Sequence, residues 1–82
     1  MNIYTGNLSL DVTEEDLRNA FRAYGEVSFV NIVRDRVKKV SAGFGFVGMT
    51  EQAEAEAAIV GLHGKDLKGR SISVNAVVPR SL

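Results

Sequence analysis

The chain has 82 residues, which is enough for one domain with a single core and too few for a second. Hydrophobic residues make up 45% of the sequence and charged residues 24%, proportions that argue against disorder and low complexity. Ten basic residues balance ten acidic ones, so the net charge by itself does not point to a polyanionic partner.

The residue counts also exclude several kinds of site. The chain has no cysteine, so it has neither a disulfide framework nor a thiolate metal site, and a single histidine cannot build a multi-histidine site. We therefore expect no metal and no cofactor. No apolar run approaches the ~18 residues of a membrane span, and residues 1–4 have no signal-like character. We expect a cytoplasmic protein without a membrane partner.

The first half of the sequence predicts a strand, a helix and a second strand. Residues 2–8 suit a strand. Thr13 is a candidate N-cap, with Asp16 at the third helical position and Gly25 at the expected C′ position. Residues 27–34 are rich in β-branched side chains and form the second strand. The helix carries one apolar stripe with i, i+3, i+4, i+7 spacing: Leu17, Ala20, Phe21 and Tyr24.

The second half repeats this plan. Residues 44–49 form a strand, Thr50 is a candidate N-cap, and residues 51–62 form a helix ended by His63 and Gly64. Residues 71–76 alternate polar and apolar side chains and form the last strand, which Pro79 would stop. The order β-α-β-β-α-β predicts an α+β, ferredoxin-like sandwich, a four-stranded antiparallel sheet with two helices on one face.

The sheet face without helices carries the candidate site. Strand alternation points Val47 and Met49 toward the helices and points Tyr4, Phe44 and Phe46 outward. The alternative is an alternation shifted by one residue, which would bury the rings but expose Val47 and Met49. Exposed aromatic rings need a partner, and flat rings along strands stack well on unpaired bases.

The same alternation places further side chains on this face. Ser73 and Asn75 point outward from the last strand, and Phe29, Asn31 and Val33 share the outward position of the second strand. Phe29 and Val33 either widen the stacking surface or form a protein interface, and the sequence does not separate these alternatives.

Two segments resemble a known family. Residues 42–49 (AGFGFVGM) resemble the octapeptide of the RNA recognition motif, and residues 3–8 (IYTGNL) resemble its hexapeptide. The resemblance covers the whole chain and is greatest to the small single-domain bacterial versions. It implies a recognition-motif domain over residues 1–78 with a short tail at 79–82. It also implies single-stranded RNA binding, with Tyr4 and Phe44 stacking on bases and Phe46 packing against sugar and base.

The sequence departs from the family pattern at three positions. Ala42 stands where the family usually has lysine or arginine, so one phosphate contact is missing. Met49 replaces a terminal aromatic residue at a core-facing position, where methionine fills space adaptably. Thr5 replaces an aliphatic residue at an inward position, so its hydroxyl group must find a backbone partner.

A basic cluster adjoins the aromatic strand, and in this family the loop that carries it often contacts RNA. The loop, residues 36–41, lacks the glycine or proline expected of a turn and contains Val37 and Val40. The alternative to RNA contact is that these basic side chains are only a run of solvated surface charges. The cluster consists of Arg34, Arg36, Lys38 and Lys39.

Other motifs have simpler explanations than catalysis. The three glycines at 43, 45 and 48 match a dinucleotide fingerprint, but they lie within a strand rather than between a strand and a helix. In an aromatic strand we expect such small residues to let bases or helices approach closely. The acidic residues 14–16 complement a helix dipole, and His63 is a turn residue. We therefore expect no enzyme.

Two functions remain. One is a single-stranded RNA-binding module, with single-stranded DNA as an alternative ligand. The other is a protein-interaction or self-association module that uses the same sheet face and the loop valines, and the neutral charge and Ala42 favour it. The three rings favour the RNA-binding function. We expect the protein to be mostly monomeric, with weak self-association as an alternative.

Overall fold

The computed structural model describes residues 1–77, so Pro79 and the tail at 79–82 lie outside the described residues. The predicted β-α-β-β-α-β order is confirmed, with one addition: a short hairpin precedes the last strand. The elements in chain order are β1 (Asn2–Gly6), α1 (Glu14–Arg22), β2 (Val27–Arg34), β3 (Ser41–Met49), α2 (Gln52–Leu62), β4 (Asp66–Leu67), β5 (Arg70–Ser71) and β6 (Ser73–Ala76). In this part of the chain, no helix is long and apolar enough to cross a membrane.

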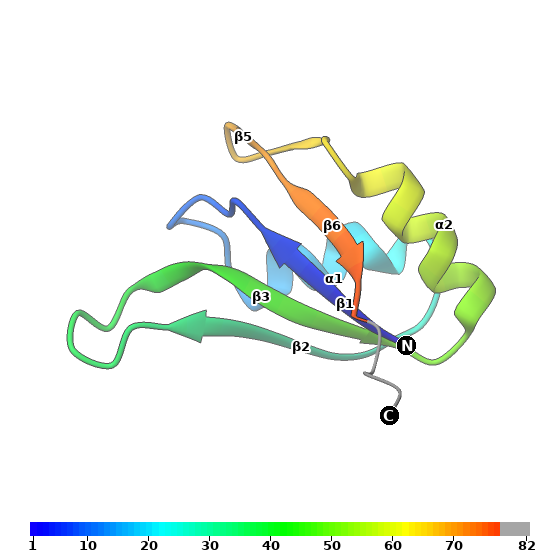
Figure 1. The fold of residues 1–82 in the computed structure, drawn as a ribbon, viewed down its shortest axis with the longest axis horizontal. Helices are drawn as coiled ribbons and strands as arrows, with labels where there is room; N and C mark the ends of the chain where they lie inside the picture. Colours follow the sequence, from blue (N-terminus) through cyan, green and yellow to red (C-terminus); the bar gives the residue numbers. More distant parts are fainter. Residues whose placement is uncertain (78–82) are drawn as a thin grey trace, which may run out of the picture.

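The four long strands form one antiparallel sheet in the order β2-β3-β1-β6. Figure 1 views this sheet with α1 behind its strands and α2 beside β6, so the helices leave one face uncovered. The core lies between the helices and the sheet, where Leu17 and Phe21 of α1 and Ala58 of α2 pack against Ile3 and Val47. The two-layer arrangement confirms the predicted fold class.

The start of α1 follows the sequence prediction closely. Thr13 is the N-cap, and its hydroxyl oxygen accepts a hydrogen bond from the Asp16 backbone N–H at 3.2 Å. The Asp16 carboxylate accepts in return from the Thr13 backbone N–H at 2.9 Å. This is a complete capping box, which satisfies two backbone donors that a helix start would otherwise leave free.

The prediction that Gly25 is the C′ residue of α1 is wrong. The helix ends at Arg22 with Ala23 as its C-cap, and Gly25 is not among the glycines with positive φ. Gly25 instead accommodates the side chain of Glu54, because a Cβ atom at position 25 would lie 2.1 Å from Glu54 Oε1. The same oxygen accepts a hydrogen bond from the Glu26 backbone N–H at 3.2 Å. Sequence alone does not separate these two uses of a glycine, because both follow a helix end.

Further boundaries differ from the prediction. The first strand ends at residue 6 instead of residue 8, and the last strand of the sheet begins at residue 73 instead of residue 71. The N-cap of α2 is Glu51, without a side-chain hydrogen bond, rather than Thr50. The third strand begins at Ser41 instead of Phe44 and continues through Gly43, whose φ of 89° breaks the regular alternation. Because a left-handed glycine inside a strand marks a bulge, the alternation could be followed only from Phe44 onward.

Candidate nucleic-acid interface

Three aromatic rings form a cluster on the uncovered face of the sheet. The centroid of the Tyr4 ring lies 6.0 Å from those of Phe44 and Phe46, and the two phenylalanine centroids are 6.2 Å apart. All three side chains are half-buried, whereas Val47 and Met49 are at most 1% exposed. The predicted alternation is therefore confirmed, and the shifted alternative is excluded.

The sheet register places polar side chains on both sides of these rings. Phe46 is the cross-strand partner of Tyr4 and of Asn31, and Tyr4 is also the partner of Asn75. Asn31 and Asn75 are exposed, and the Asn75 amide donates to Ser73 Oγ at 3.2 Å. The structure thus brings the predicted residues Asn31, Ser73 and Asn75 to the same face as the rings, with hydrogen-bonding groups at its margins.

Gly6 positions the Tyr4 ring, a role that the sequence analysis did not predict. A Cβ atom at Gly6 would lie 2.5 Å from the Tyr4 hydroxyl oxygen and 2.8 Å from Cε2, so the ring extends along β1 over this glycine. The signal was present in the sequence, because residues 4 and 6 share one face of a strand. Because Gly6 has no side chain, the Tyr4 ring can lie close to the backbone of β1.

Gly45 has a different role from the one we expected of small residues in this strand. We predicted that they let bases or helices approach. A Cβ atom at Gly45 would instead lie 2.4 Å from the Asn31 carbonyl oxygen and 3.0 Å from Ile32 Cα, both in the backbone of β2. Thr5 Oγ1 donates to the Gly45 carbonyl oxygen at 3.1 Å, which confirms that the buried hydroxyl group finds a backbone partner. Gly45 thus allows close contact between β2 and β3.

The β2–β3 loop is an ordered turn built by an aspartate. Asp35 Oδ1 accepts from the backbone N–H groups of Val37 at 2.8 Å and Lys38 at 3.0 Å, and these bonds hold the pKa of Asp35 below its usual value. Lys39 adopts a left-handed conformation with φ of 56°. The loop therefore has turn chemistry, although it lacks glycine and proline.

The cations of this loop differ in how they are engaged. Arg36, Lys38 and Lys39 are exposed, and within residues 1–77 none of them forms an ion pair. Arg34 forms a two-point ion pair with Glu14 of α1, in which Nη2 lies 2.9 Å from Glu14 Oε1. This pairing turns the Arg34 side chain toward α1 and away from the aromatic cluster. RNA contact by all four cations stays a prediction, and for Arg34 it requires release from Glu14.

The ion pair makes part of the folding stability pH-dependent. Hydrogen bonding from Arg34 lowers the pKa of Glu14 from 4.5 to about 2, so the pair stabilises the fold above pH 4.5 and loses this effect as the pH falls toward 2. We expect Glu14→Gln to lower the urea midpoint at pH 7, and only slightly because both partners are exposed. We also expect the urea midpoint of this variant to fall less than that of the parent between pH 4.5 and pH 2. Glu15→Gln, which removes a charge without an ion pair among residues 1–77, is the control. Parallel acid profiles for Glu14→Gln and the parent would contradict the assignment.

The residues set aside as non-catalytic have structural partners. Asp16 caps α1 and forms an ion pair with Lys68 at 2.9 Å. His63 does more than end α2, because its Nδ1 accepts a hydrogen bond from the Val74 backbone N–H at 3.0 Å and so joins the helix end to β6. In the part of the chain that the structure describes, no group of three acidic or histidine side chains could hold a metal ion.

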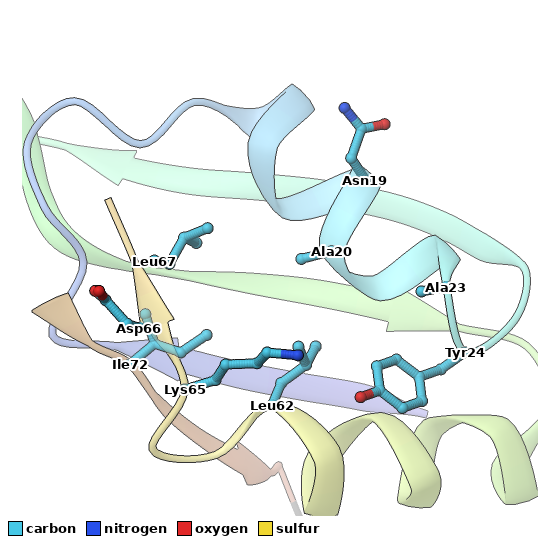
Figure 2. Close-up of a pocket in the computed structure, with 9 residues that line it drawn as sticks. All are labelled: Asn19, Ala20, Ala23, Tyr24, Leu62, Lys65, Asp66, Leu67 and Ile72. Carbon is cyan, nitrogen blue, oxygen red and sulfur yellow. The ribbon is translucent and has the colours of Figure 1, made fainter. Parts of the chain in front are cut away.

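A groove of about 250 Å³ lies among the helices and the β4–β5 hairpin. Its lining is mostly aliphatic, and Figure 2 shows Leu67 and Ile72 opposite Ala20, with the Tyr24 hydroxyl group and the Lys65 amine near its rim. The groove is on the helical side of the sheet. It is therefore separate from the aromatic cluster on the uncovered face.

Comparisons with known proteins identify the family of this chain. The family model for the RNA recognition motif matches residues 3–73, and the chain therefore belongs to the RNA recognition motif family. It is 49% identical over 80 residues to a Nostoc protein named "Putative RNA-binding protein RbpB", which covers 98% of this chain and 78% of that protein. It is 45% identical over 73 residues to glycine-rich RNA-binding protein 1 of Mycosarcoma maydis, covering 89% of this chain and 42% of the relative.

Solved structures give the same result. The crystal structure of the RNA binding protein PG1 superposes with a TM-score of 0.92 at 39% identity, covering 100% of this chain and 99% of that one. A complex of the Sxl-lethal protein with RNA superposes with a TM-score of 0.89 at 29% identity, covering 98% of this chain and 48% of that one. The predicted family is confirmed, and the chain is not an enzyme.

Proposed function

We propose that this protein binds single-stranded RNA on the uncovered face of its sheet, with bases stacked on Tyr4 and Phe44 and with Phe46 packed against sugar and base. Membership of the RNA recognition motif family and the names of its relatives support RNA binding. Single strands are the form whose unstacked bases a flat sheet can receive. The domain has room for about two to four nucleotides.

The observation that carries this proposal is the ring cluster on a face without helices. The centroids of the three rings lie within 6.2 Å of one another, and the rings are flanked by exposed Asn31 and Asn75. A protein that needed these rings for its core would cover them with a helix. Rings that stay half-exposed beside amide groups offer both stacking and base-edge hydrogen bonds.

The charge balance supports weak and moderately salt-dependent binding by a single domain. Ten basic and ten acidic residues give no long-range attraction, so loop cations such as Lys38 and Lys39 supply the phosphate contacts. We further propose that the protein acts as a monomer in the cytoplasm. Single-stranded DNA is a weaker alternative ligand in this proposal.

An NMR titration with short homopolymeric RNAs and the matching DNAs tests the function. Shifts concentrated at Tyr4, Asn31, Phe46 and Asn75 support the proposal. Shifts confined to the helical groove around Leu67, or none at millimolar RNA, would reject it.

A gain-of-binding variant tests the path of the RNA backbone. Ala42 is exposed at the start of β3, where the family usually carries a cation. Ala42→Arg should add one phosphate contact, which makes the slope of log K against log salt steeper by about 0.7 for a single strand. Base preference should not change, because phosphate contacts position the strand without reading sequence. Salt titrations of the parent and the variant check this, and identical slopes would place position 42 away from the backbone.

A further inference from the structure

A fourth aromatic ring lies on the uncovered face, outside the Tyr4–Phe44–Phe46 cluster. Phe29 of β2 pairs with Gly48 in the register, and Asn31, two residues further along the same strand face, pairs with Phe46. The Phe29 side chain is 40% exposed and takes no part in the buried core.

Phe29 is held in place by a glycine on the neighbouring strand. A Cβ atom at Gly48 would lie 2.1 Å from Phe29 Cε1 and 2.3 Å from Cδ1, so the ring occupies the space above this glycine. Only a residue without a side chain at position 48 allows this arrangement. The ring is thus packed against the β3 backbone on one side and open on the other, as a stacking platform requires.

The surroundings of the ring suit a nucleotide. Phe29 is diagonal to Phe46 across the β2–β3 pair, a separation of about 7–8 Å in a regular antiparallel sheet. This spacing is within the reach of neighbouring nucleotides on one strand of RNA. Exposed Asn31 neighbours both rings, because it lies two residues from Phe29 on β2 and directly opposite Phe46. Ser28 Oγ comes within 2.8 Å of the same Cβ position above Gly48.

We propose that Phe29, resting on Gly48, is an additional stacking position that takes one more nucleotide of single-stranded RNA beyond the Tyr4–Phe44–Phe46 cluster, with the Asn31 amide at the edge of its base. This proposal rests on the proposed function and extends its surface toward β2. Continuity with the ring cluster favours RNA over a protein partner as the occupant.

The test compares a dinucleotide, which the cluster can hold alone, with a hexanucleotide that can also reach Phe29. We expect Phe29→Ala to weaken hexanucleotide binding about 5- to 150-fold, as loss of one stacked base implies, and to leave dinucleotide binding unchanged. The salt slope should stay the same, because stacking releases no counterions. Val60→Ala removes an 82% exposed side chain on α2 and is the matched control.

A second variant moves the ring without deleting it. Gly48→Ala must displace Phe29, so it should also weaken hexanucleotide binding selectively. Circular dichroism and sedimentation of each variant accompany the titrations. Equal weakening for both RNA lengths, no weakening for either, or a change in oligomeric state without a change in RNA binding would overturn the proposal. Tyr4→Ala separates it from the proposed function, since failure of that variant to weaken either RNA would reject both.

Discussion

Tyr4→Ala and Phe44→Ala should each weaken single-stranded RNA binding by about 1–3 kcal/mol, the range for loss of one aromatic stacking partner. The rings are half-buried and lie outside the core between helices and sheet. Their contribution to folding is therefore limited to ring–ring packing, about 0.5–1.5 kcal/mol for each pair. Fluorescence or NMR titrations measure the first effect, and urea unfolding measures the second.

The geometry of the cluster adds a sharper expectation. The Tyr4 and Phe44 rings are stacked, with centroids 6.0 Å apart and planes 29° apart. Removing one ring disturbs the position of the other, so the double variant should lose less than the sum of the single losses. If both single variants bind RNA like the parent, base stacking at this face is refuted. If both unfold, the rings belong to the core after all.

Gly45→Ala should cause a large loss of stability without touching the RNA-facing surface. Its Cβ atom would lie 2.4 Å from the Asn31 carbonyl oxygen, and the backbone of β2 cannot move aside as a side chain can. Overpacking of this kind costs about 1–3 kcal/mol and occasionally more. Urea unfolding gives the midpoint and slope from which the loss is read.

Gly6→Ala is the matched variant. The three atoms nearest its Cβ atom would all belong to the Tyr4 side chain, whose ring can rotate away. We expect a smaller loss of stability than for Gly45→Ala, together with weaker RNA binding, because the displaced ring no longer lies along β1. Equal destabilisation by the two variants would contradict the separate roles assigned to these glycines.

The sequence by itself predicted the order of the elements, the apolar stripe of α1 and the face of the sheet on which the rings lie. These features depend on local rules, since a strand alternates every second residue and a helix repeats every 3.6. Thr13 and Asp16 specify the start of α1 for the same reason, because both partners of the capping box lie within one turn. The family motifs added the identity of the ligand class.

Only the tertiary structure decided which partners distant residues take. Arg34 and Glu14 are 20 residues apart in the chain, and their ion pair engages a cation that the sequence assigned to RNA. Gly25 accommodates Glu54, and Gly48 supports Phe29, although each resembles an ordinary turn or strand glycine in sequence. The left-handed Lys39 and the Asp35 turn formed where no glycine or proline marked a loop. Such contacts depend on how two elements meet in space, which periodicity along one element does not encode.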